Sequence, residues 1–344
     1  MIEVSEKNAA PLQLRSKSET SPGYWRLAWR RLKANRAAMI GGVFILLLAL
    51  SALSADVIAI KPYDKQSLRD NNAIPGWLPS LFPSVKPKTE GGYARVNDAF
   101  PLGADYAGRD IFSRLVYGAR ISLAVAVIGP LISLLIGVAV GCIAGYFGGW
   151  VDNLLMRIVD LMYAFPSLLL IILIMSVFRS AVNADNVSPL VLSIAKLDAA
   201  FGGLLFIFIG LGITSWENMA RLTRGQVLSA RERDYVLSAQ AIGADNRRIL
   251  IRHILPNILG PLIVAETLAI PAYILTETFL SYIGLGVNKP TPSWGAMIAD
   301  GVQGISTYPN QVFFPALILA LTMFAFNFLG DGIRDALDPR SSRR

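Results

Sequence analysis

The sequence has little charge and almost none of the side chains on which metal sites and nucleophilic catalysis depend. Only 16% of its 344 residues are charged, whereas about a quarter is usual in soluble domains. The single cysteine, Cys142, excludes a disulfide framework, and the single histidine, His253, has no Ser or Cys partner. No His/Cys/Asp cluster has metal-ligand spacing, and the phosphate-binding pattern G-x-x-x-x-G-K-[ST] is absent. The composition argues against a soluble enzyme, and any ATP that the protein needs must be hydrolysed by another chain.

Hydrophobic residues are abundant instead, at 53% of the chain, and mean hydropathy is +0.49. The formal net charge is +8. In a soluble protein such an excess would suggest a nucleic-acid partner, but in a hydrophobic chain basic residues mark the cytoplasmic side of a membrane. We therefore predict membrane lipid, and no nucleic acid, around this protein.

Six apolar runs are long enough to cross a bilayer, which needs about 20 mostly apolar residues. The runs are Ala37–Ala55, Ile121–Phe147, Leu161–Phe178, Ala199–Trp216, Ile258–Thr276 and Gln311–Leu329. One such run is often a buried core helix, but six are not. The sequence predicts an all-α integral membrane protein with six transmembrane helices.

The distribution of basic residues predicts the topology. Residues 1–36, loop 217–257 and the C-terminal tail are rich in Lys and Arg, whereas 180–198 and 284–310 have few. Because basic residues collect in the cytoplasm, both termini should be cytoplasmic. Loop 61–118 does not follow the rule but is long, and its Pro and Gly content favours an irregular extracytoplasmic loop.

These boundaries divide the chain into five segments. They are a cytoplasmic tail at 1–36 with an interfacial helix at Tyr24–Arg36, a first transmembrane helix at 37–60, the extracytoplasmic loop 61–118, a five-helix core at 119–333, and a cytoplasmic tail at 334–344.

Polar and small residues inside the predicted spans indicate packing or function. Gly137, Gly141 and Gly145 recur every four residues, which places them on one face where a neighbouring helix can approach closely. Glu266 and Glu277 are eleven residues apart and share a face of the fifth span. An intramembrane acid faces a bundle interior or water, so each of the two lines a polar pathway or is a hydrogen-bonded packing group.

Loop 217–257 has the pattern of a short helix held between two longer ones. We expect the short helix at Tyr235–Ile242, with Asp234 as its N-cap and Gly243 ending it in the left-handed conformation. Asp245 or Asn246 starts the next helix. The small residues Ser238, Ala239 and Ala241 suit insertion into a groove on another protein.

The same stretch resembles the EAA loop of ABC importer permeases, whose pattern is E-A-A, three residues, G, nine residues, I-x-L-P. Ala239, Gly243, Leu255 and Pro256 agree with it. Leu237 replaces the family's Glu, Ser238 the first Ala, and His253 the Ile. The departure at the acid removes a contact but keeps the helix–glycine–helix plan.

Three other blocks are similar to permeases of the peptide type. They are the lead-in to the second span at Pro101–Leu123, the outer segment at Leu280–Gly295, and the C-terminal signature at Phe326–Arg340. Four blocks in this order resemble the second permease subunit of dipeptide, oligopeptide and nickel importers, over residues 24 to 340.

The resemblance implies a type I ABC importer permease fold in a multi-subunit machine that performs no covalent chemistry in this chain. A homologous permease would complete the pathway, two ATPase subunits would bind ATP and Mg²⁺, and an extracytoplasmic binding protein would deliver cargo. This chain would bind no cofactor and no metal. Its ATPase-docking residues would be Tyr235, Ser238, Ala239, Gln240, Ala241, Gly243 and Pro256.

The residues leave several functions open. The cargo is a dipeptide or oligopeptide, or instead a nickel complex or glycan. An intramembrane enzyme would need paired catalytic groups at membrane depth, and a membrane scaffold without transport would leave the ordered loop unexplained. Recovery of ATPase subunits with this chain would separate transport from both.

Overall fold

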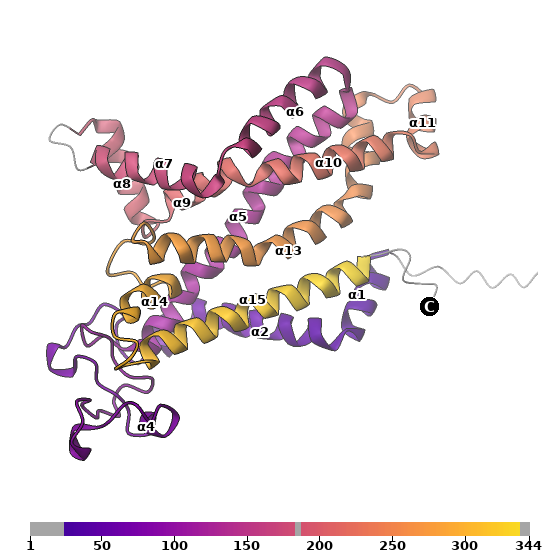
Figure 1. Cartoon of the computed structure of the whole chain (residues 1–344). Coiled ribbons are helices and arrows are strands. Elements are labelled where there is room, and N and C mark those ends of the chain that lie inside the picture. Colours follow the sequence, from indigo (N-terminus) through magenta and orange to yellow (C-terminus); the bar gives the residue numbers. More distant parts are fainter. Residues whose placement is uncertain (1–23, 183–186, 338–344) are drawn as a thin grey trace, which may run out of the picture.

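Helices dominate the computed structural model, which describes residues 24–182 and 187–337 (Figure 1). The predicted tails therefore lie partly outside the described residues, at 1–23 and 338–344. The α-helices are α1 (Tyr24–Ala34), α2 (Arg36–Leu53), α3 (Ala55–Ile58), α4 (Leu78–Leu81), α5 (Ile111–Phe147), α6 (Gly149–Ala164), α7 (Ser167–Val182), α8 (Pro189–Ala200), α9 (Leu205–Thr214), α10 (Trp216–Arg231), α11 (Asp234–Ala241), α12 (Asn246–Arg248), α13 (Leu255–Tyr282), α14 (Trp294–Val302) and α15 (Asn310–Leu337). Short 3₁₀ turns lie at Leu68–Asp70 and Lys88–Glu90, and a π turn at Ile249–Ile254 joins α12 to α13.

Within the described residues, four stretches are long and apolar enough to cross a membrane as continuous helices: α2, α5, Asn246–Tyr282 and α15. Two more spans pass the same test only as bent pairs. α6 and α7 meet at 80°, and α8 meets Leu205–Arg231 at 97°. The prediction of an all-α membrane protein is confirmed, with up to six spans among the described residues.

The bends correct the predicted third and fourth spans, which are not single straight helices. Pro166 lies between α6 and α7 and lacks the N–H that a continuous helix needs. Gly202 and Gly203, between α8 and α9, adopt φ of +67° and +86°, which no α-helix contains. The same bend places a helix, α8, where residues 180–198 were expected to form a loop.

α5 begins earlier than its apolar run indicates, so the outer loop ends at Asp110 rather than at residue 118. The Asp110 carboxylate accepts a hydrogen bond from the Ser113 N–H at 2.8 Å and caps the helix. The loop itself is irregular but has its own small core of Ile74, Leu78 and Val85. Residues 284–310 likewise contain α14, whose fully buried Trp294 packs against α5.

The glycine face of α5 lies against α10, as predicted. A Cβ on Gly137, Gly141 or Gly145 would come within 2.9 Å of atoms of α10. The carbonyl oxygen of Ala220 would be only 2.5 Å from a Cβ on Gly141. The two helices pack closely because these three positions have no side chain.

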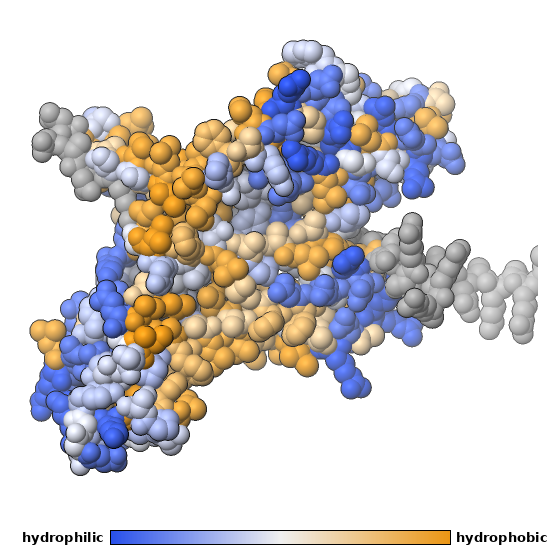
Figure 2. Space-filling view, viewed as in Figure 1, coloured by the Kyte–Doolittle hydropathy of each residue, from blue (hydrophilic) through white to orange (hydrophobic). Residues whose placement is uncertain are grey.

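Hydrophobic surface lies between two hydrophilic ends (Figure 2). One end is the loop before α5, and the other includes α6, α10 and α11. α11, the first helix and the end of α15 lie at the same end of the molecule in Figure 1, away from α4 and α14. An apolar belt with polar ends is the surface expected of a protein that crosses a bilayer.

Candidate functional site

α11 is a short helix exposed at the hydrophilic end and held between α10 and the π turn before α13. Its N-cap is Arg233, and no side chain caps it, so the prediction that Asp234 is the N-cap is wrong; Asp234 is the first helical residue. Gly243 follows with φ of +78°, as predicted, and its N–H donates to the Gln240 carbonyl at 2.9 Å. The left-handed glycine turns the chain sharply back toward the membrane.

The inner face of α11 packs on its own chain. Val236 and Ala239 are buried, and both belong to one hydrophobic cluster with Ile249, Ile254 and Val227. Only 5% of Ala239 is exposed. The prediction that Ala239 is a docking residue is therefore corrected: it fixes α11 to its supports and is not available to another protein.

The outer face of α11 carries the side chains that can dock. Tyr235, Ser238, Gln240 and Ala241 are exposed, as a docking role requires. Two apolar neighbours that the pattern did not single out, Leu237 and Ile242, are also exposed, the latter by 86%. Apolar side chains in water at a hydrophilic end are typical of a protein interface. We call Tyr235, Leu237, Ser238, Gln240, Ala241 and Ile242 the outer face of α11.

The supports of α11 are fixed by polar contacts. The Asp245 carboxylate accepts from the Arg247 N–H at 3.1 Å, so of the two predicted starts Asp245 is the cap. Tyr146 of α5 donates to Asn246 Oδ1 at 2.9 Å. Arg224 of α10 pairs with Asp152 of α6, with Nη2 to Oδ2 at 2.6 Å.

Pro256 lies exposed in the first turn of α13, directly after the π turn Ile249–Ile254, so the helix that runs from Asn246 to Tyr282 lacks an N–H donor at this point. This helix leads from α11 to the residues at membrane depth, and Pro256 is not part of the outer face of α11.

A cavity of about 360 Å³ opens between α7, α9, α10 and α13. Its lining combines apolar residues such as Ile171 and Leu211 with polar ones from all four helices. Glu266 of α13 is one of the lining residues, so the structure places this predicted residue at a polar hollow rather than toward lipid. A charged side chain at membrane depth costs at least about 2.5 kcal/mol, which such surroundings reduce.

Hydroxyl groups hold Glu266 in place. Ser133 Oγ of α5 lies 2.5 Å from Glu266 Oε1 and 3.0 Å from the Ser215 carbonyl oxygen. The Tyr273 hydroxyl donates to Glu266 Oε2 at 3.3 Å. These bonds tie α5, the start of α10 and α13 together at one point.

Glu277 occupies a different environment. Its side chain is fully buried, and Ser281 Oγ donates to its Oε1 at 2.6 Å. Ser281 in turn lies 3.2 Å from Ser293, just before α14. Glu277 lines neither the 360 Å³ cavity nor the outer one described below, so the structure brings only Glu266 of the predicted pair to a cavity.

Glu217 is a cavity residue that the sequence did not reveal. It lies in the first turn of α10, lines the 360 Å³ cavity and is only 8% exposed. The sequence pattern made it the first residue of a cytoplasmic loop because it follows the apolar run Ala199–Trp216. Its position directly after that apolar run was the one feature of the sequence that could have indicated a place near the membrane.

A second, outer cavity of about 910 Å³ lies beside α14 and the loop before α5. Lys289 and Asp300 line it and pair at 3.1 Å, which raises the pKa of Lys289.

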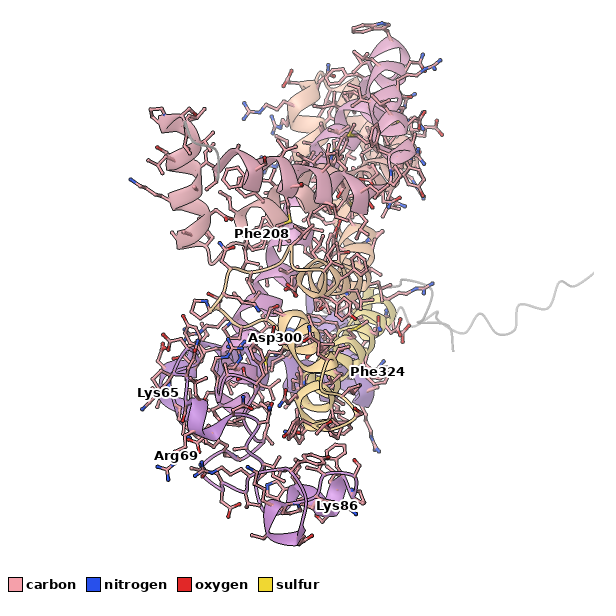
Figure 3. The ribbon with its side chains drawn as sticks, turned by 60° about the vertical axis from the view of Figure 1, so that its left-hand side comes forward. Lys65, Arg69, Lys86, Phe208, Asp300 and Phe324 are labelled. Carbon is pink, nitrogen blue, oxygen red and sulfur yellow. The ribbon has the colours of Figure 1, made fainter. Side chains whose placement is uncertain are left out.

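At the start of α5, burial raises the pKa of the N-cap Asp110, although hydrogen bonds from Ser113 oppose the shift. Figure 3 shows Asp300 between α9, where Phe208 is labelled, and the loop before α5. The labelled basic residues of that loop are Lys65, Arg69 and Lys86.

The fold and these sites define a class: an integral membrane protein that combines a cavity at membrane depth with a short helix exposed at one hydrophilic end. The chain belongs to the family of binding-protein-dependent transport system inner membrane components, whose model matches residues 137–343. A second model, the N-terminal TM domain of oligopeptide transport permease C, matches residues 23–75.

Relatives match the chain over nearly its whole length. It is 39% identical to the oligopeptide transport system permease protein OppC of Bacillus subtilis (strain 168), over 99% of this chain and 97% of that protein. It is 40% identical to the dipeptide transport system permease protein DppC of the same organism, over 94% and 88%. The oligopeptide permease OppC of Escherichia coli (strain K12) is 35% identical, over 98% and 99%.

The fold is also similar to a solved structure of the MetNI methionine ABC transporter in an inward-facing conformation. The TM-score is 0.50 at 19% identity, covering 66% of this chain and 98% of that one. The predicted resemblance and the type I importer fold are thus confirmed. The chain is a permease subunit of an ABC importer, a multi-pass membrane subunit without a catalytic role, and it works with a partner permease and ATPase subunits.

Proposed function

We propose that this permease forms, with a homologous permease, the pathway of an importer for peptides. Its relatives are named as oligopeptide and dipeptide transport permeases. The coupling role is supported by the outer face of α11, where the apolar side chains of Leu237 and Ile242 are exposed on a short helix that packs on α10 and the π turn. Docking of this face on an ATPase subunit would transmit ATP-driven closure to the spans.

The remaining partners follow from the same arrangement. Two ATPase subunits would bind ATP and Mg²⁺, and each would receive one such helix. An extracytoplasmic binding protein would deliver cargo at the outer loop, residues 61–110. This chain itself would bind no cofactor and no metal, so its contribution is positional: it lines the pathway and changes shape with the ATPases.

The orientation that fits is one with both termini and α11 in the cytoplasm of a bacterium and the outer loop outside the inner membrane. Basic residues at 1–36 and in loop 217–257 support it. The joint position of α1, α11 and the end of α15 at one end of Figure 1 supports it too.

Co-purification and uptake test the proposal together. Leu237→Asp with Ile242→Asp places two charges on the outer face of α11 without touching the buried Val236 or Ala239. We expect the variant to insert normally, to lose the ATPase subunits on purification and to lose uptake of labelled di- and tripeptides. Leu68→Asp, at an exposed position of the outer loop, is the matched control and should retain the ATPases.

Retention of the ATPases by the α11 variant would contradict the docking role. Normal docking without uptake of any peptide by the parent importer would instead contradict the cargo. The two parts of the proposal therefore fail in distinguishable ways.

A further inference from the structure

We propose that Glu217 and Glu266 form a subsite for the ammonium group of a peptide inside the 360 Å³ cavity. The inference rests on the proposed function for the identity of the cargo. The two carboxylates come from different helices, α10 and α13, and line the same hollow. Ser215 and Asn218 add polar groups to the lining.

Within the described residues, no basic side chain lies at salt-bridge distance from either carboxylate, although the charge of Arg221 acts on Glu217 from farther away. The ion pairs of the described residues 24–182 and 187–337 involve neither Glu217 nor Glu266. Arg221, one turn along α10 from Glu217, pairs with Asp160 at 2.7 Å. Two buried acids that line one cavity and form no salt bridge there favour binding of a positively charged group.

Among the residues that the structure describes, Glu217 lacks a hydrogen-bond donor at one of its carboxylate oxygens. More than nine-tenths of this residue is buried, and within the described part of the chain its Oε2 has no hydrogen-bond donor. A buried acceptor without a donor loses the hydrogen bonds that water gave it, so a ligand that brings a donor restores them. Glu266, in contrast, is held by Ser133 and Tyr273 and presents a fixed position to the ligand.

An ammonium group fits these requirements better than a metal ion. It carries one positive charge and three N–H donors, enough to serve both carboxylates. A cavity of about 360 Å³ lies in the range of small-molecule sites, and Ile171, Leu211 and Leu222 offer apolar walls for peptide side chains. No group of three or more His, Cys, Asp or Glu residues that could hold a metal occurs in the described ranges.

Charge-selective modification of the cavity tests the subsite directly. Asn218→Cys places a thiol in the lining, while native Cys142 is buried elsewhere. In the complete importer in detergent, we compare cationic aminoethyl and anionic sulfonatoethyl methanethiosulfonate and normalise the rates to free cysteine. The normalised ratio should favour the cation by about tenfold, as expected for a cavity of one charge sign.

The ratio should fall toward that of free cysteine in Glu217→Gln and in Glu266→Gln. Glu277→Gln is the matched control: it removes a buried acid from the same helix as Glu266 but outside the cavity, and the ratio should stay. An unchanged ratio in both cavity variants would overturn the subsite. Loss of the partner permease from either variant would overturn it too, because a basic side chain of that subunit would then be the cation.

Protection by peptide identifies the ligand. Trialanine should slow modification of Asn218→Cys, N-acetyl-trialanine should not, and the protection should vanish in both cavity variants. Equal protection by the two peptides would overturn the ammonium assignment. If the parent importer takes up no peptide yet keeps its charge selectivity, the peptide assignment fails with the proposed function. Intact uptake without selectivity or protection overturns the subsite alone.

Discussion

Gly243 sets the direction in which the chain leaves α11. At φ of +78°, a residue with a Cβ is strained by about 1–2 kcal/mol. A Cβ there would meet no atom within 4 Å, so the effect is one of backbone conformation and not of crowding.

We therefore expect Gly243→Val to insert normally but to couple ATP hydrolysis to uptake poorly, because α11 would no longer hold its orientation. Uptake and ATPase co-purification are the measurements. Gly225→Ala adds a Cβ in equally open space within helical α10 and should leave both unchanged. Full uptake by Gly243→Val would show that the turn is not needed for coupling.

Ala239 gives the opposite prediction, since it faces the core of its own loop. Ala239→Glu would place a charge among Val236, Ile249 and Ile254, where burying an unpaired ion costs several kcal/mol. The expected result is a lower melting temperature or a lower yield of folded permease before any partner is added. Gln240→Glu, on the exposed side, should melt like the parent. Equal melting of both variants would place Ala239 at the surface.

At the scale of the element, α5 packs closely on α10 because the glycines at the contact have no Cβ atom. Gly141→Ala would put a Cβ within 2.6 Å of both the Ala220 carbonyl oxygen and Thr223 Cβ. Overpacking of this kind costs about 1–3 kcal/mol. Thermal unfolding of the purified permease should show the loss, whereas Gly42→Ala in α2, with its nearest atom at 3.6 Å, should not.

The continuous helices were predictable from the sequence because a long, predominantly apolar run has only one inexpensive conformation in a bilayer, even where a single acid such as Glu266 interrupts it. This holds for α2, α13 and α15. The start of α5 could not be predicted from the sequence, because Arg114 and Arg120 argue against a helix in lipid. Arg120 instead donates to the Ala52 carbonyl at 2.6 Å and pairs with Asp56, partners that only the folded chain supplies.

The site was predictable to a similar degree. Gly243 and the order of helices around α11 followed from local rules of capping. Which side of α11 faces inward did not, because it depends on where Ile249 and Ile254 lie after the π turn. Glu217 was missed because the direction of a side chain at the end of an apolar run is set by the break between α9 and α10.

For the whole molecule, the two hydrophilic ends give a topology test. Ser84 is exposed in the outer loop, and Ser229 is exposed on α10 near α11. A membrane-impermeant thiol reagent applied to intact cells should modify Ser84→Cys but not Ser229→Cys, against a background in which native Cys142 is buried. Labelling of Ser229→Cys alone would invert the proposed orientation.

The length of α5 links these ends. Its 37 residues extend over about 55 Å, whereas the hydrocarbon core is about 30 Å thick. One helix therefore contacts both the outer loop, through Asp110, and the supports of α11, through Tyr146. A tilt of this helix changes both surfaces at once, so the free-energy coupling between them is reciprocal. If ATP-driven closure at α11 changes the affinity of the outer loop for a bound protein by some factor, binding of that protein must change the affinity for ATP by the same factor.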